Sequence, residues 1–89
     1  MINEELLQAD GLDAALIGLG TRCSKPDILV YDVDKVIDIL ITRDGMDEEG
    51  AWEYFHFNIE GAWHGESTPI WMYPLKDGVK DERISEYFH

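Results

Sequence analysis

The chain has 89 residues, 45% of them hydrophobic, so it is long enough for a single domain (1–89) with one modest core and too apolar for a disordered acidic tail. Its 19 acidic and 7 basic residues give a formal net charge of −12, which argues against direct binding to nucleic acid or to anionic membranes. The lone cysteine, Cys23, excludes an internal disulfide, and no apolar run approaches the roughly 20 residues that span a bilayer. We therefore expect a protein of a reducing, cytoplasmic compartment.

The N-terminal part of the chain predicts a short helix followed by a strand. Residues 3–9 (NEELLQA) suit one or two helical turns, with Asn3 as the N-cap. Residues 14–20 (AALIGLG) are apolar but too short and too rich in glycine for a helix, so they predict a strand. Gly18 and Gly20 within it indicate a bulge or a close approach of another backbone.

Asp32 and Asp34 follow an apolar run (28–31), as do the paired aspartates of haloacid-dehalogenase-type phosphotransferases. The residues that follow the second aspartate in those enzymes are absent here. From Val33 onward, apolar residues recur at i+3, i+4, i+7 and i+8, which predicts a helix over 33–43. Asp32 is then its N-cap, and residues 28–31 are a strand-like approach or a loop.

A second helix is predicted to start directly after Asp47, which is its N-cap, and to end at Gly61 or Gly65. Its expected inner side holds Ala51, Phe55, Asn58, Ile59 and Ala62. Its expected outer side holds Glu49, Glu53, His56, Glu60 and His64. Trp52 and Trp63 lie at the boundary between the two sides.

The remaining segments complete an α+β domain. Residues 68–75 (TPIWMYPL) predict a strand, Asp77–Gly78 a turn, and residues 80–89 a last short helix. The order β-α-α-β predicts a short, antiparallel sheet on which the two adjacent amphipathic helices pack.

The outer side of the second helix contains a candidate metal site. His56, Glu60 and His64 recur at i, i+4 and i+8, and Glu53 precedes His56 by three residues. Those spacings align side chains on one helical face, but the only other histidine, His89, is the last residue. A metal-binding module or metal-dependent enzyme is therefore only an alternative hypothesis. Our main expectation is a protein with neither a cofactor nor enzymatic activity.

The charge is unevenly distributed along the chain. The interval from Asp44 to Leu75 contains no Lys or Arg, seven acids and all three tryptophans. Such a segment predicts an acidic, aromatic-edged surface for a basic partner. The candidate partner-binding residues are Asp47, Glu48, Glu49, Glu53, Glu60, Trp52 and Trp63.

Four strings carry a resemblance: DGLDAALIGLGTRC, YDVDKVIDIL, TRDGMDEEGAWEYFHFN and GAWHGESTPI. Over residues 10–71 the chain resembles a group of small, uncharacterised proteins of bacteriophage and prophage genomes. The resemblance implies a phage protein made in the cytoplasm of a bacterial host, and it implies no catalytic motif.

Composition and resemblance together suggest a non-enzymatic phage accessory protein that binds and modulates a host protein. One form of this hypothesis is an anti-CRISPR inhibitor that acts as a DNA mimic. Its carboxylates would take the place of phosphates against a basic nucleic-acid-binding groove. A structural or assembly role as a homo-oligomer is a further alternative.

Overall fold

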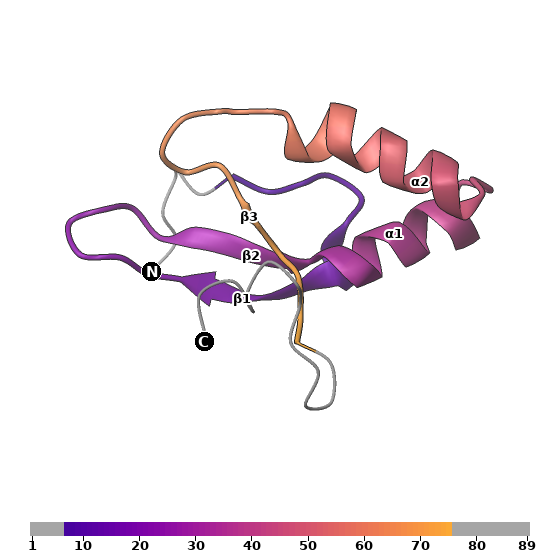
Figure 1. The fold of residues 1–89 in the computed structure, drawn as a ribbon. Helices are drawn as coiled ribbons and strands as arrows, with labels where there is room; N and C mark the ends of the chain where they lie inside the picture. The colour runs from indigo at the N-terminus through magenta and orange to yellow at the C-terminus, as the bar shows by residue number, and fades with distance from the viewer. Residues whose placement is uncertain (1–6, 76–89) are drawn as a thin grey trace, which may run out of the picture.

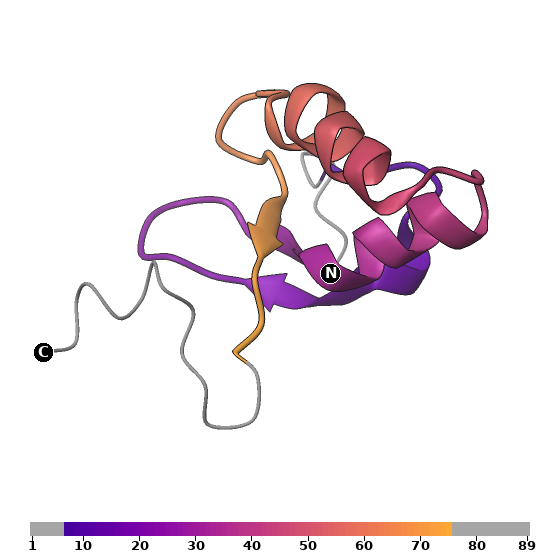
Figure 2. The same ribbon diagram turned by 45° about the vertical axis from the view of Figure 1, so that its right-hand side comes forward.

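The computed structural model describes residues 7–75 (Figure 1). The turn at Asp77–Gly78 and the helix expected over 80–89 lie outside the described residues, as does most of the helix expected over 3–9. Within the described part, a three-stranded sheet carries two helices on one face, and Figure 2 shows the helices together on one side of the strands. The α+β fold class is therefore confirmed. No helix in residues 7–75 is long and apolar enough to cross a bilayer.

The sheet has the order β1 (Leu16–Gly20), β2 (Ile28–Asp32), β3 (Ile70–Met72). β2 is antiparallel to β1 and parallel to β3. Of the two alternatives for residues 28–31, a strand-like approach or a loop, the structure has the strand, and this strand is the central one. The expected pairing of the two predicted strands with each other was wrong. The parallel pair forms because the helices between β2 and β3 return the chain across one face of the sheet.

A bulge interrupts the pairing of β1 with β2, as the glycines predicted. Leu16 lies opposite Tyr31 and Gly18 lies opposite Val30, so Ile17 is the extra residue. A short 3-10 turn, η1 (Asp13–Ala15), leads into this strand.

The first helix, α1 (Val33–Thr42), agrees with its predicted range and orientation. The carboxylate of Asp32 accepts a hydrogen bond from the backbone N–H of Lys35 at 3.3 Å, so Asp32 is the N-cap and the phosphotransferase interpretation is unnecessary. The buried side chains of α1 are those of Val33, Val36, Ile37 and Leu40.

The second helix has two parts, α2 (Glu48–Tyr54) and a π-helix, η2 (Phe55–Glu60). Asp47 caps α2 as predicted, with Oδ1 2.7 Å from the backbone nitrogen of Gly50. Gly61 ends η2, which confirms one of the two predicted terminators.

The π-helical turn is a feature that the sequence did not predict. Its closing bond runs from the N–H of Gly61 to the carbonyl of His56, five residues back, at 3.1 Å. A Cβ on Gly61 would lie only 3.0 Å from that carbonyl oxygen, so a glycine fits this wide turn and a larger residue would crowd it.

The core lies between the helices and the sheet and is centred on two aromatic residues, Tyr31 and Phe55, which are both 0% exposed. The Tyr31 and Trp71 rings lie 5.2 Å apart, and Phe55 meets Trp71 edge-on at 5.8 Å. The hydroxyl of Tyr31 accepts a hydrogen bond from the backbone N–H of Ala9 at 2.9 Å. This bond ties the segment before η1 to the central strand.

Candidate partner-binding surface

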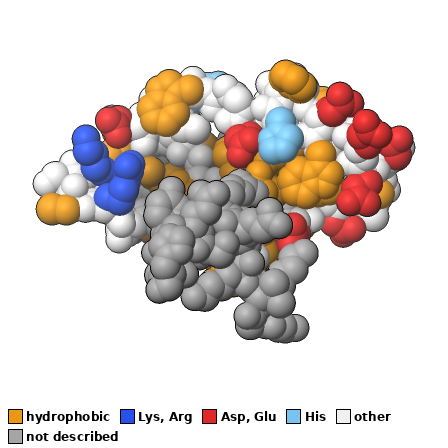
Figure 3. Space-filling view, viewed as in Figure 1, with side chains coloured by type: hydrophobic (Ala, Val, Ile, Leu, Met, Phe, Trp, Pro, Cys, Tyr) orange, Lys and Arg blue, Asp and Glu red, His pale blue; other side chains and the backbone are white. Residues whose placement is uncertain are grey.

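The outer side of α2 and the start of η2 form a shallow groove, which we call the acidic groove. Its lining residues are Glu48, Glu49, Trp52, Glu53, His56 and Phe57. Acidic side chains gather over the α2 end of the molecule in Figure 3, with aromatic side chains beside them. The groove thus combines a carboxylate rim with an apolar floor.

Trp52 is a fixed wall of this groove, because three neighbouring rings hold it. It stacks on Tyr73 at 6.4 Å with an interplanar angle of 7° and on His56 at 5.8 Å and 28°. It also meets Phe55 edge-on at 6.1 Å. The half-buried indole is therefore preorganised, and docking against it costs little side-chain entropy.

Phe57 is a site residue that sequence reasoning missed. Its side chain is 80% exposed, more than that of any other large hydrophobic residue in the described part of the chain. The signal for it was its position: Phe57 follows Glu53 by four residues and Glu49 by eight, on the predicted outer side of the helix. An exposed aromatic side chain within an acidic rim is an anchor of the kind that interfaces favour.

Glu60 makes contacts within the protein instead of facing solvent freely. Its Oε1 lies 2.7 Å from Nδ1 of His56, and its Oε2 accepts a hydrogen bond from the hydroxyl of Tyr73 at 3.4 Å. Glu60 thus braces the aromatic stack from the edge of the acidic groove.

The structure brings together only some of the predicted partner-binding residues. Glu48, Glu49, Trp52 and Glu53 line one groove. Asp47 caps α2 beside it. Trp63 is 73% exposed, but it follows the end of the helix and does not line the groove.

The candidate metal ligands do not converge. The helix ends at Gly61, so the expected i, i+4, i+8 alignment does not extend to His64. The backbone N–H of His64 instead donates to Oγ1 of Thr68 at 2.7 Å. Residues 7–75 contain no group of three or more His, Cys, Asp or Glu side chains placed to hold a metal ion.

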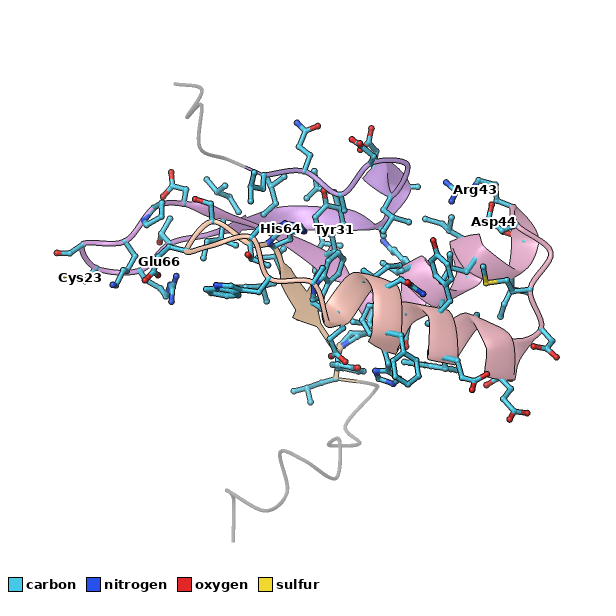
Figure 4. All side chains as sticks on the ribbon, turned by 90° about the horizontal axis from the view of Figure 1, so that it is seen from above. Cys23, Tyr31, Arg43, Asp44, His64 and Glu66 are labelled. Atoms are coloured by element: carbon cyan, nitrogen blue, oxygen red, sulfur yellow. The ribbon has the colours of Figure 1, made fainter. Side chains whose placement is uncertain are left out.

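Basic residues gather at the opposite end of the molecule, in the loop between β1 and β2 (Figure 3). Arg22 and Lys25 lie 3.9 Å and 3.6 Å from the carboxylate of Glu66, and the exposed Cys23 lies in the same loop (Figure 4). Charged side chains are therefore unevenly distributed along the described part of the protein, and its acidic end is at α2.

Arg43 and Asp44 form a close ion pair at the C-terminal end of α1. Nε and Nη2 of Arg43 donate to the two carboxylate oxygens of Asp44 at 2.9 Å and 3.0 Å. This bidentate bond lowers the pKa of the Asp44 carboxyl and raises the pKa of the Arg43 guanidinium. Nη1 of Arg43 also donates to the carbonyl of Gly11 at 2.6 Å.

Comparison with protein-family models, with curated proteins and with solved structures finds no match.

Proposed function

We propose that this chain is a small phage accessory protein that binds a basic surface of a host protein through its acidic groove and thereby modulates that protein. The observation that carries the proposal is the acidic groove, in which three carboxylates surround two aromatic side chains, one of them 80% exposed. Residues 44–75 contain no Lys or Arg that would neutralise this surface.

Charge supplies the attraction and the orientation in this proposal. A net charge of −12 accelerates encounter with a basic partner, and the uneven charge distribution turns the α2 end toward it. Carboxylates on the rim then occupy positions where a nucleic acid would place its phosphates.

The aromatic side chains supply short-range affinity. Burying an exposed Phe side chain against a partner contributes about 1.5–3 kcal/mol. Phe57 is free to do so, while Trp52 presents a rigid face beside it. A basic groove of a nucleic-acid-handling protein, such as a host defence complex, has the complementary charge, so an inhibitor of such a complex is the form of the proposal that we favour.

Affinity capture with the tagged full chain from phage-infected bacteria, followed by mass spectrometry, identifies the partner. The purified pair then tests the groove. The double variant Glu49→Lys with Glu53→Lys should weaken binding by more than about tenfold, which corresponds to about 1.4 kcal/mol. It should also reduce the salt dependence of the dissociation constant.

A matched control keeps the change in net charge the same. Asp13→Lys with Asp38→Lys reverses two exposed carboxylates that do not line the groove. This control should retain most of the affinity, and circular dichroism checks that both variants are folded. Unchanged affinity and salt dependence in the Glu49/Glu53 variant, or equal losses in both variants, would refute binding through the groove.

A further inference from the structure

A second surface lies on a different side of the same helix. A cleft of about 510 Å³ opens between the segment that precedes η1, the C-terminal end of α1, the α2–η2 helix and the loop that leads to β3. Figure 4 labels Arg43 and His64, which reach it from α1 and from that loop. Its volume is in the range of small-molecule sites, about 300–1,000 Å³.

The π-helix contributes directly to this cleft. η2 supplies Asn58 and Ile59 to the wall, and Ala62 follows just after Gly61 closes the wide turn. π-helical turns are rare and occur frequently at functional sites. This unusual backbone thus coincides with the cleft and marks it as more than a packing defect.

Polar groups with spare hydrogen-bonding capacity line the cleft among apolar walls. Within residues 7–75, no hydrogen bond to another protein group engages the side chains of Tyr54, Asn58 or His64. Together they offer a phenol hydroxyl, an amide and an imidazole, which donate and accept. Leu40 and Trp71 form part of the apolar lining.

The charges of the cleft restrict the class of ligand. The guanidinium of Arg43 is already committed to Asp44 and to the carbonyl of Gly11, so it is not free to bind an anion. The net charge of −12 disfavours an anion further. The apolar walls disfavour a cation: of the two carboxylates that line the cleft, that of Asp44 is paired with Arg43, and that of Asp10 lies on the exposed segment before η1.

We propose that this cleft binds a small, uncharged, planar molecule, such as a heterocycle or an aromatic amide. The ring lies against Leu40, Ile59 and Trp71, and its polar edge meets Tyr54, Asn58 and His64. Aromatic side chains favour a flat ring, and groups that both donate and accept favour a neutral polar edge. Because the cleft and the acidic groove lie on different sides of the α2–η2 helix, the two sites are tested independently.

Three probes of nearly the same shape test the ligand class: benzamide is uncharged, benzoate is anionic and benzamidine is cationic. Each is titrated into the full, isotope-labelled chain, and amide resonances are followed by NMR. Benzamide should produce saturable shifts at Asn58, Ala62 and His64, with a dissociation constant several-fold lower than for either charged probe. Three outcomes would overturn the proposal: no saturable shift with any probe, shifts confined to Trp52 and Phe57, or a charged probe that binds as tightly as benzamide or more tightly.

Variants locate the bound probe. Ala62→Leu fills the cleft and should abolish the benzamide shifts, whereas Phe57→Ala, in the acidic groove, should leave them unchanged. Asn58→Ala removes one polar partner from an exposed position, so it should weaken benzamide several-fold even if Ala62→Leu does not fold. If both cleft variants fold and bind benzamide with full affinity, the probe binds elsewhere and the site is refuted. If Ala62→Leu does not fold, full benzamide affinity in Asn58→Ala alone refutes the site.

Discussion

Replacing Asp47 by alanine should destabilise the helix that bears both surfaces. Oδ1 of Asp47 lies 2.7 Å from the backbone nitrogen of Gly50, a short N-cap hydrogen bond, and the carboxylate also faces the positive end of the helix dipole. Loss of such a cap costs about 1 kcal/mol, with a range of about 0.5–2 kcal/mol. For a domain of this size that loss lowers the midpoint of thermal unfolding by roughly 4–8 °C.

Two comparison variants separate the hydrogen bond from the charge. Asp47→Asn keeps an oxygen that can cap the helix, so it should lose only the dipole contribution, about 0.3–1 kcal/mol. Asp32→Ala removes the cap of α1, where the bond to Lys35 is longer at 3.3 Å, and should cost less than Asp47→Ala. The expected order of free-energy loss is therefore Asp47→Ala first, followed by the two milder variants.

Urea unfolding followed by tryptophan fluorescence and by far-UV circular dichroism measures these differences. Both probes should report one transition, which licenses a single free energy of unfolding. An Asp47→Asn variant as unstable as Asp47→Ala would show that charge, not the cap, stabilises the helix. An Asp47→Ala variant as stable as the parent would contradict the cap altogether.

Three further measurements test the core and the ion pair. Tyr31→Phe should cost about 1–3 kcal/mol in urea unfolding, because the N–H of Ala9 loses its acceptor; no loss would contradict that bond. Phe55→Ala should cost about 3–5 kcal/mol, and a cost below that of Tyr31→Phe would show that this 0% exposed ring is not central. NMR titration should find the pKa of the Asp44 carboxyl below its ordinary value, so the stability that this ion pair contributes is present above the unfolded-state pKa and is lost as the pH falls through the folded-state pKa. Arg43→Ala should abolish the pKa shift of Asp44. A pKa shift that survives this variant would have another cause.

The helices were predictable because their information is local. Five apolar residues at helical spacing after Asp32 define α1, and an aspartate placed before each helix supplies its cap. Gly18 likewise indicated a bulge in β1, since a strand tolerates glycine where its pairing is irregular. In each case the pattern and its physical cause lie within a few residues of each other.

The central strand was not predictable in this way. Ile28, Leu29 and Tyr31 are all buried, so β2 lacks the alternation of apolar and polar residues that marks a half-buried strand. Its parallel partner, β3, lies about forty residues further along the chain, and no local signal specifies that pairing. Only the return of the chain over two helices brings them together.

The acidic groove was predictable in charge but not in shape. Acidic residues on one side of a helix follow from sequence spacing, and Glu49 and Glu53 lie where expected. Phe57 follows Glu49 and Glu53 at the same four-residue spacing, whereas the position of Trp63 outside the groove depends on where the helix ends. The cleft could not be predicted from local sequence, because four separate segments of the chain line it.

The α2–η2 helix therefore has to meet three demands at once. Ala51 and Phe55 fix it to the core, Glu53 and Phe57 face one solvent region, and Asn58 faces another. A regular α-helix distributes its side chains at a single angular interval, and a π-helical turn changes that interval partway along. The wide turn closes at Gly61, where a Cβ would lie only 3.0 Å from the carbonyl oxygen of His56, and this close approach is a physical reason for a glycine here despite its cost to the helix.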